Sequence, residues 1–424
     1  MRKYTVILEI KGEEVITGYI EGNSSEDAIF YYAEDYLSRN DPKAISVSLP
    51  IQAEAFSARR TKVFFSGMLP EGFMRKTVAN NMHVDEDDYL SILQCLGKEC
   101  LGAIRIDESG DDGGAVYEEI SPEQVRQLAS EGTMKSSEYV IKAHLSLTGA
   151  SGKAGLYFDE QNNKWYLPRG LAPSTHIVKQ SHIRLDGIVT NEQISMLAAG
   201  KCGIDIPGSF IINVGNGLDS EVLFATKRYD RVINEHSKVI SGLKRPFRLH
   251  QEDFAQALGI EASEKYEKPG DQYAVKMFEI IRNYSADPLG DTLKLWNRMV
   301  FDYALGNTDA HIKNFSLLYD PDLRSVRLSP AYDMISTAIY NASTREMSFN
   351  IGGKRNLDLI TEEDFRIMAE QAGIGKKVAG NAYYSVLNGF EKAVKEAAEE
   401  LSALGFKNAV SIGERILMAR KRIL

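Results

Sequence analysis

The chain has 424 residues, of which 43% are hydrophobic and 26% are charged, so it can bury one large core or two to three smaller ones. Its net charge of −9 argues against a protein that grips nucleic acid through its overall electrostatic field. Three cysteines, Cys95, Cys100 and Cys202, are too few and too irregularly spaced for a disulfide framework or a zinc site. Because the chain starts without a signal-peptide core and has no apolar run long enough for a bilayer, we expect a cytoplasmic protein without membrane contact.

The first predicted elements form a mixed α/β region that ends in a polar linker. Two β-rich runs, residues 4–8 and 15–20, flank a polar turn and predict a hairpin. Three further elements are expected before residue 100: a helix over 25–38, a strand over 45–50 and an amphipathic helix over 85–96. Residues 107–121 then switch to Asp, Glu, Gly and Ser, which is typical of a solvated loop between domains.

The middle of the chain alternates short strands with one helix, and helices dominate after about residue 250. Ser121 and Pro122 are typical of a helix start, as capping residue and first-turn proline. The strands expected next lie at 156–158, 165–168, 176–179, 209–214 and 222–226, with a helix over 191–200. The later helices are expected at 362–370, 382–401 and 412–421, where apolar residues recur at three-four spacing. The predicted fold class is therefore α+β.

Asp309, Asn314 and Asp333 form the most informative pattern in the chain. Asn314 follows Asp309 by five positions (309 to 314), and Asp333 follows Asn314 by nineteen (314 to 333). Enzymes of the protein-kinase type use such a set, because one carboxylate orients the attacking hydroxyl while an amide oxygen and a second carboxylate hold Mg²⁺ on the nucleotide phosphates. His311 and Lys313 lie between them and can stabilise charge on a transferring phosphoryl group. The structural alternative is that Asp309 caps a helix, His311 packs in a core, and Asn314 and Asp333 form turns.

Three further segments are candidates for nucleotide binding. Lys179 ends a strand-like apolar run, where a lysine can reach phosphates and pair with Glu192. Residues 148–155 form a small-residue loop whose backbone amides can approach phosphate oxygens, with Lys153 adding charge, although it lacks the Walker A pattern. Residues 224–231 run from a strand into a charged segment, where a kinase hinge would meet adenine. The plain alternatives are a surface lysine, an ordinary turn and an edge strand with a solvated end.

Several motifs spread over nearly the whole chain point to one family. In chain order they lie at 65–72 (F-S-G-M-L-P-E-G) with Arg75, and at 97–103, 146–153, 175–179, 191–192, 229–231, 249–253, 309–316 and 332–336. The last two, D-A-H-I-K-N-F-S and Y-D-M-I-S, are specific in combination. Together these segments resemble the HipA-like serine/threonine kinases, the toxin components of bacterial HipBA toxin–antitoxin pairs.

The resemblance implies a two-lobed fold distantly like protein kinases. It assigns residues 1–110 to a HipA-like N-terminal α/β subdomain, 111–245 to a nucleotide-binding mixed α/β lobe, and 246–424 to an all-helical catalytic C-terminal lobe. It also implies ATP- and Mg²⁺-dependent phosphorylation of a protein serine or threonine. Asp309 would be the catalytic base, assisted by His311 and Lys313, and Asn314 and Asp333 would hold Mg²⁺. The residues implied in nucleotide binding are Thr148, Gly149, Ala150, Ser151, Gly152 and Lys153 over the phosphates, Lys179, the backbone of Lys227, Arg228 and Tyr229 at adenine, and His311, Asn314, Tyr332 and Asp333.

The resemblance further implies regulation and partners. Ser146 would be autophosphorylated, which would eject its loop and shut the enzyme off. The substrate would be a cellular protein; aminoacyl-tRNA synthetases are among the substrates of such kinases, and their phosphorylation slows growth. The partner would be a HipB-like helix-turn-helix antitoxin, and operator DNA would be contacted mainly through that antitoxin.

Two alternatives stay open. Because Ser151 and Gly152 depart from the family's loop, the chain can instead be a catalytically weak, nucleotide-binding co-repressor that acts through its antitoxin. The other alternative is a metal-dependent hydrolase that uses His250 and His311 with the two aspartates, although these residues lack the tight H-x-x-E-H type of spacing.

Overall fold

The computed structural model describes residues 1–107, 114–131, 133–143, 152–182 and 185–421. The chain forms two compact units, each built from separate stretches of sequence. Unit 1 comprises Met1–Gln180, Ala225–Ala262 and Leu318–Ser325, and unit 2 comprises Ser181–Phe224, Ser263–Leu317 and Val326–Leu424. Three of the boundaries between them fall within β10 (Val222–Lys227), within the 3-10 turn η2 (Ala262–Glu264) and within β16 (Ser316–Tyr319), and the other two follow Gln180 and Ser325.

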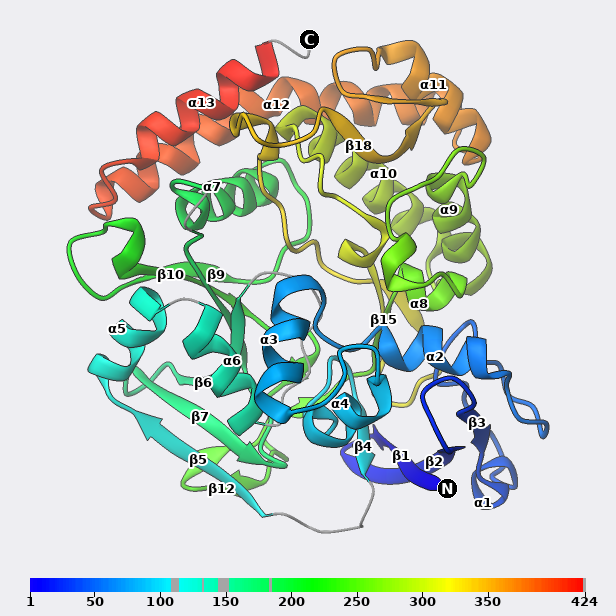
Figure 1. Cartoon of the computed structure of the whole chain (residues 1–424). Coiled ribbons are helices and arrows are strands. Elements are labelled where there is room, and N and C mark those ends of the chain that lie inside the picture. The colour runs from blue at the N-terminus through cyan, green and yellow to red at the C-terminus, as the bar shows by residue number, and fades with distance from the viewer. Residues whose placement is uncertain (108–113, 132, 144–151, 183–184, 422–424) are drawn as a thin grey trace. The chain divides into compact units, whose positions relative to one another are not determined.

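The N-terminal part of unit 1 is a four-stranded antiparallel sheet in the order β3-β2-β1-β4 (Figure 1). Its strands are β1 (Arg2–Ile10), β2 (Glu13–Gly22), β3 (Ile29–Tyr32) and β4 (Ile104–Asp107). One face is buried under aromatic side chains, since the ring of Phe30 lies 5.8 Å from that of Phe56 and 5.4 Å from that of Phe65. The predicted hairpin is confirmed, and Lys11 and Gly12 make its turn with positive φ angles.

The predicted helix over residues 25–38 is wrong for most of its length. These residues contain strand β3 and only a single-turn helix, α1 (Glu34–Leu37). Phe30 and Tyr32 are buried while Tyr31 between them is half-buried, which is the period-two pattern of a strand. The strand predicted over 45–50 is likewise only an isolated bridge between Ser46 and Leu49.

A second antiparallel sheet of unit 1 has strands in the order β5-β7-β6-β8. Its strands are β5 (Ala115–Ile120), β7 (Lys164–Gly170), β6 (Lys153–Asp159) and β8 (His176–Gln180), and α5 (Pro122–Glu131) and α6 (Thr133–Lys142) belong to the same unit. Tyr117 and Tyr157 pack in its core with ring centroids 4.4 Å apart. The strands predicted over 156–158, 165–168 and 176–179 and the helix start at Pro122 are confirmed.

Short elements complete unit 1. They are α2 (Ala58–Ser66), α3 (Gly72–Met82), α4 (Tyr89–Leu96), β11 (Arg231–Val232), β12 (Val239–Ile240), β13 (Leu243–Lys244), β14 (Phe247–Arg248), β15 (Gln251–Asp253) and α8 (Phe254–Leu258). Helix α8 shows why such a short helix can form. Asp253 and Gln256 make a capping box at its start, and Gly259 ends it with a φ of 68°.

Helices dominate unit 2. They are α7 (Ile188–Lys201), α9 (Tyr273–Tyr284), α10 (Pro288–Leu305), α11 (Glu362–Gln371), α12 (Lys376–Ala403) and α13 (Ala409–Lys421), and α12 and α13 run alongside each other (Figure 1). Helix α10 has clear end signals in the sequence: Asp287 caps it, Pro288 begins it and Gly306 ends it with a φ of 68°. Its Phe301 packs against Phe390 of α12, with ring centroids 5.3 Å apart. The three helices predicted after residue 360 are confirmed.

The expectation of an all-helical C-terminal lobe needs a correction, because this part of the chain also contains short strands. Besides β14, β15 and β16, they are β17 (Val326–Leu328), β18 (Glu346–Ile351) and β19 (Lys354–Asn356). Unit 2 also includes β9 (Ser209–Asn213) and the 3-10 turns η1 (Asp219–Glu221), η3 (Ile312–Asn314) and η4 (Thr337–Ile339). Met347, Phe349 and Ile351 alternate along β18 and are buried, which favours a strand. Gly352 and Gly353 both have positive φ and make the two-residue turn to β19.

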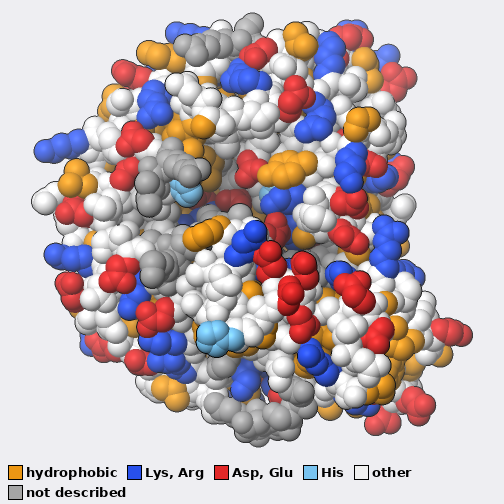
Figure 2. Space-filling view, in the orientation of Figure 1, with side chains coloured by type: hydrophobic (Ala, Val, Ile, Leu, Met, Phe, Trp, Pro, Cys, Tyr) orange, Lys and Arg blue, Asp and Glu red, His pale blue; other side chains and the backbone are white. Residues whose placement is uncertain are grey.

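The surface carries both signs of charge. Figure 2 shows Lys and Arg side chains interspersed with Asp and Glu over the face drawn there, so that face presents no continuous field of one sign. Among the described residues, no helix is both long and apolar enough to cross a membrane.

Candidate active site

The loop that carries Asp309 leaves the end of α10 and is fixed by hydrogen bonds within unit 2. The Asn307 side chain donates to Asp302 Oδ1 over 2.9 Å, and the Asn307 amide donates to the Asp302 carbonyl over 2.9 Å. One residue on, the Thr308 amide donates to Thr337 Oγ1 over 2.8 Å. Ser348 of β18 donates from Oγ to the Thr308 carbonyl over 2.8 Å. Hydrogen bonds to Asp302, Thr337 and Ser348 therefore fix the backbone immediately before Asp309.

Asp309 is exposed, although its neighbours Thr308 and Ala310 are buried. The Tyr266 hydroxyl donates to Asp309 Oδ1 over 2.5 Å. The Tyr266 ring meets the His311 ring edge to face, with centroids 5.4 Å apart. A rigid backbone thus presents one carboxylate to solvent, which suits a general base that must reach the hydroxyl of another molecule.

Asn314 is tied directly to the residue five positions before it. Its side-chain nitrogen donates to the Asp309 carbonyl over 3.0 Å, and its amide donates to the His311 carbonyl over 2.8 Å in the turn η3. Because the amide nitrogen is used in this way, the side-chain oxygen is the atom that can take a further ligand. His311 and Lys313 are buried in the same loop.

Arg298 of α10 joins this loop to the segment that carries Asp333. Its Nη2 donates to the Asn314 carbonyl over 2.7 Å and to the Tyr332 carbonyl over 2.8 Å. The Tyr332 hydroxyl in turn donates to the Lys313 carbonyl over 3.0 Å. The structure therefore brings Asp309, Asn314 and the backbone before Asp333 into one hydrogen-bonded assembly inside unit 2.

Asp333 itself has a φ of 59°, in the left-handed region. This conformation is uncommon outside glycine, although Asp tolerates it better than most residues. Such backbone conformations concentrate at functional sites, where the surrounding structure holds them. The following residue, Met334, is buried, so the segment is anchored immediately after the aspartate.

Two residues of this assembly were not predicted from the sequence. Arg298 lies inside the apolar run of α10, and a charged residue in such a run can indicate a buried side chain with polar partners. Asp302, one turn later, is fully buried, and its Oδ2 lies 3.7 Å from Arg298 Nε. Burial raises the pKa of Asp302 to about 6, against the opposing effects of Arg298 and the hydrogen bond from Asn307.

A magnesium ion of the kinase type needs only one or two protein oxygens besides the nucleotide phosphates. Asn314 and Asp333 supply an amide and a carboxylate oxygen, so the donor chemistry fits that ion. The hydrolase alternative finds less support: no group of three or more His, Cys, Asp and Glu side chains suited to a metal occurs in the described part of the chain. His250 belongs to unit 1, is buried, and has Nε2 2.7 Å from the Ile45 carbonyl.

The predicted phosphate-binding lysines belong to unit 1. Lys153 in β6 and Lys179 in β8 are direct cross-strand partners, so their side chains lie on the same face of the sheet. Glu192, predicted to pair with Lys179, is buried in α7 of unit 2, and this pairing stays a prediction.

The segment predicted to meet adenine, Lys227–Tyr229, is held mainly through Arg228. The Arg228 amide donates to the Thr175 carbonyl over 2.9 Å. Its guanidinium is completely buried and donates to Asp230 and Glu99, so this side chain is structural. Lys227, by contrast, is exposed, and its Nζ lies 3.4 Å from Glu160 Oε1. The Tyr229 hydroxyl donates to the side-chain oxygen of Gln251.

Glu99 is the centre of a buried charge network that sequence reasoning missed. Arg228, Arg231 and Arg248 all donate to its carboxylate, over 3.1, 3.0 and 2.7 Å. Burial by itself would raise the pKa of Glu99, but the three guanidinium groups hold it well below its ordinary value. The network joins residue 99 to the backbone after β10 and so fixes the predicted hinge segment within unit 1.

Part of the predicted site lies outside the described residues, namely Ser146, Thr148, Gly149, Ala150 and Ser151. Gly152 and Lys153 are described, and both are buried at the start of β6.

Comparison with known proteins identifies the family. Residues 145–399 match the HipA-like C-terminal domain, and residues 8–107 match the HipA N-terminal domain. The chain belongs to the HipA-like family. This HipA-like chain is 29% identical over 419 residues to the "Putative kinase Y4mE" of Sinorhizobium fredii, covering 95% of this chain and 94% of that protein. It is 24% identical over 414 residues to the serine/threonine-protein kinase toxin HipA of Shewanella oneidensis, covering 94% and 89%.

A solved structure confirms the fold of the HipA-like chain. It is the Shewanella oneidensis MR-1 HipA toxin in complex with HipB and operator DNA, which matches with a TM-score of 0.78 at 19% identity and covers 99% of this chain and 97% of that chain. The resemblance stated from the sequence motifs and the predicted α+β, HipA-like fold are thus confirmed.

Proposed function

We propose that this HipA-like chain is an ATP- and Mg²⁺-dependent serine/threonine-protein kinase. The observation that carries the proposal is the assembly in unit 2, in which Asn314 binds the Asp309 carbonyl while Arg298 binds the carbonyls of Asn314 and Tyr332. A kinase needs a catalytic loop and a metal-binding aspartate at fixed separation. This assembly fixes the backbone of both.

The described side chains would have different roles in phosphate transfer. Asp309 would orient the acceptor hydroxyl and accept its proton, and the buried His311 and Lys313 would add positive charge where the phosphoryl group leaves the nucleotide. Bound Mg²⁺ would neutralise phosphate charge, held by Asn314 and Asp333.

The proposed nucleotide contacts follow the resemblance residue by residue. Lys153 and Lys179, as cross-strand partners, would contact phosphates together with Gly152 and the residues 148–151. The backbone of Lys227–Tyr229 would meet adenine, and Tyr332 would complete the nucleotide site beside Asp333. In this proposal, residues 1–110, 111–245 and 246–424 act as N-terminal subdomain, nucleotide-binding lobe and catalytic lobe.

The proposed biology is that of a toxin with a helix-turn-helix antitoxin. The support is the relative solved together with HipB and operator DNA and the net charge of −9, which leaves DNA contact mainly to a partner. The substrate would be a cellular protein, with an aminoacyl-tRNA synthetase as the first to test, and phosphorylation of Ser146 would end activity. We expect the protein to act in the cytoplasm, where ATP is available and its three free cysteines stay reduced.

Labelled ATP with Mg²⁺ tests the proposal. We expect autophosphorylation that mass spectrometry maps to Ser146 and that Asp309→Asn abolishes without a change in thermal unfolding. Asp205→Asn is the matched control, because Asp205 is an exposed aspartate of the same unit whose side chain pairs with Lys294. Full phosphate transfer by Asp309→Asn would contradict the role of Asp309.

The second candidate function is a co-repressor that binds nucleotide but transfers little phosphate. The replaced loop residues Ser151 and Gly152 favour it. Tight nucleotide binding by calorimetry, with no transfer in the presence or absence of the antitoxin, would identify this function.

A further inference from the structure

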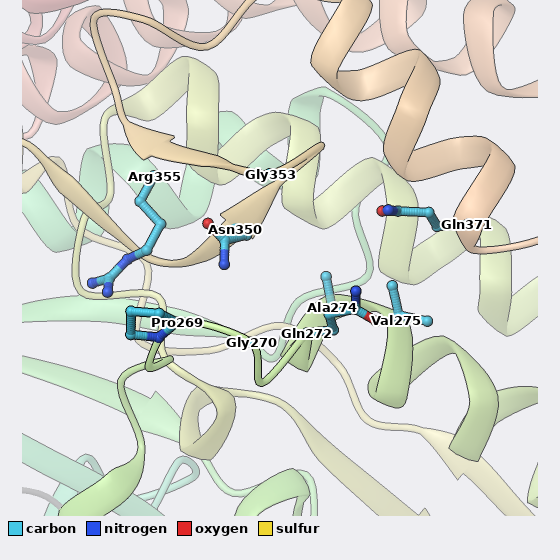
Figure 3. A pocket seen from close by; sticks show the side chains of 9 residues that line it. All are labelled: Pro269, Gly270, Gln272, Ala274, Val275, Asn350, Gly353, Arg355 and Gln371. Carbon is cyan, nitrogen blue, oxygen red and sulfur yellow. The ribbon is translucent and has the colours of Figure 1, made fainter.

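Unit 2 contains a pocket that no step of the proposed phosphate transfer uses. It has a volume of about 470 Å³, within the range of about 300–1,000 Å³ that is common for ligand sites. The start of α9, the β18–β19 hairpin and the end of α11 surround it (Figure 3). Gln272, Asn350 and Gln371 contribute amide groups to its lining, and Ala274 and Val275 contribute a small apolar wall.

Arg355 is the only charged residue among those that line the pocket in the described part of the chain. Its Nε donates to the Met347 carbonyl over 2.8 Å and its Nη1 to the Glu267 carbonyl over 2.7 Å. These bonds hold the guanidinium in place through uncharged acceptors. Among the described residues, no carboxylate lies within ion-pair distance of it. An arginine has five N–H donors, so the guanidinium of this pocket-lining residue keeps donors that these two carbonyls do not use.

Glu267, whose carbonyl accepts a hydrogen bond from Arg355, does not pair with this cation through its carboxylate. Glu267 is buried, and its carboxylate accepts hydrogen bonds from the Tyr273 amide over 3.0 Å, from the Asn350 amide over 3.1 Å and from the Asn350 side chain. Its oxygens are therefore occupied by amide donors of Tyr273 and Asn350, while the guanidinium of Arg355 remains available for an incoming anion.

Two short backbone routes connect the pocket to Asp309. Tyr266 donates to the Asp309 carboxylate, and the next residue, Glu267, holds Asn350 and Arg355 of the pocket. Along β18, Ser348 binds the Thr308 carbonyl, and Asn350 follows two residues later. Two residues of a strand span about 7 Å, so the pocket lies on the order of 10 Å from Asp309.

We propose that this pocket binds an acidic side chain of the protein substrate, within about three residues of the serine or threonine that receives the phosphate. An extended peptide covers about 10 Å in three residues, which matches the separation between the pocket and Asp309. A carboxylate meets the arginine fork in a bidentate geometry that a neutral side chain does not reproduce. The inference rests on the proposed kinase function and adds a specificity-determining residue, Arg355, to it.

Binding of fluorescent peptide pools tests this inference without phosphate transfer. One pool has Asp or Glu at random within three positions of a central Ser, and the other has Lys at the same positions; fluorescence anisotropy measures both. We expect the full-length protein to bind the acidic pool at least about tenfold more tightly, the value of one charge-assisted hydrogen bond. Arg355→Gln should lose that preference, and Arg355→Glu should reverse it.

Matched variants separate a loss of recognition from a loss of folding. Arg355→Lys keeps the cation and should retain a preference for the acidic pool even where the carbonyl contacts of Arg355 weaken. Arg366→Gln changes an exposed arginine of α11 that lies outside the pocket lining and pairs with Glu363, and it should bind both pools as the wild type does. Equal binding of the two pools by the wild type, or an unchanged preference in Arg355→Gln, would overturn the inference.

The same peptides with ATP and Mg²⁺ distinguish this inference from the proposed function. Preferential binding of acidic peptides without any phosphate transfer would support the pocket and contradict the kinase. Phosphate transfer that ignores the acidic residues would support the kinase and contradict the pocket.

Discussion

Replacing Arg298 with methionine tests whether one buried guanidinium holds the catalytic loop against the Asp333 segment. The change removes charge-assisted hydrogen bonds to the carbonyls of Asn314 and Tyr332, each worth about 1.5–3 kcal/mol. It also removes the cation that faces the buried Asp302, and breaking a buried charge pair by removing one partner costs about 3–5 kcal/mol. Because these contributions overlap, we expect the free energy of unfolding of unit 2 to fall by about 3–5 kcal/mol at pH 7.

Tryptophan fluorescence in urea can follow unit 2 separately. The chain has two tryptophans: Trp165 lies in β7 of unit 1, and Trp296 is buried in α10 of unit 2, two residues before Arg298. In a Trp165→Phe background, Trp296 reports on the helix that carries Arg298. Arg366→Met, which changes an exposed arginine of α11, is the matched control and should leave the urea midpoint unchanged.

A second variant decides whether the unpaired carboxylate causes the loss. Once Arg298 is gone, the buried Asp302 carboxyl loses the cation that lowers its pKa, so it must stay ionised without that cation or take up a proton. Adding Asp302→Asn to Arg298→Met should therefore recover about 1–3 kcal/mol. Phosphate transfer should stay low in the double variant, because the carbonyls of Asn314 and Tyr332 still lack their shared donor. A loss below about 1 kcal/mol in Arg298→Met, or a double variant no more stable than the single one, would refute this reasoning.

Three further predictions concern other parts of the chain. Tyr266→Phe removes the hydrogen bond to Asp309, and we expect kcat for phosphate transfer to fall about tenfold with thermal unfolding unchanged; an unaltered pH–rate profile would exclude this positioning role. Burial raises the pKa of Glu252 to about 7, so its folded state binds a proton more tightly than the unfolded chain does. That contribution to stability is present below about pH 4.5 and lost as the pH rises through about 7, roughly 3 kcal/mol in all, and Glu252→Gln should flatten this slope in unfolding experiments over that range. Gly102→Ala should cost about 1–3 kcal/mol in denaturant unfolding, because Gly102 has a φ of +73° and a new Cβ would lie 2.8 Å from the Gln251 amide nitrogen.

Residue patterns within a segment predicted the helices and strands whose structure depends mainly on that segment. The N-terminal hairpin follows from two β-rich runs around a polar turn, and α11, α12 and α13 follow from apolar residues at three-four spacing. The helix predicted over 25–38 was wrong because Phe30 and Tyr32 are buried at strand spacing. They pack against Phe56 and Phe65, which are distant in sequence, and this packing outweighs the local preference of the segment for a helix.

The candidate site shows the same limit. Asp309 and Asn314 are close in sequence, so their spacing alone predicted a kinase-type loop, but the hydrogen bond from Asn314 to the Asp309 carbonyl is seen only in the structure. Tyr266 and Arg355 contribute through contacts across more than forty residues, and no periodic pattern carries such information. Arg298 lies in an apolar run, which is a weak signal of burial, and the packing of α10 shows that its side chain is turned inward.

The anchoring of the chain on both sides of Asp309 limits what evolution can place there. Fixing a side chain in one position costs conformational entropy. At Asp309 this entropy is lost when unit 2 folds, before a substrate binds. A glutamate at 309 would carry its carboxyl one methylene farther out, and a backbone bound at Thr308 and Asn314 has no slack to draw it back. The fixed backbone therefore sets the length that the side chain at 309 must have. We expect changes in the range of accepted substrate proteins to arise at residues farther from Asp309.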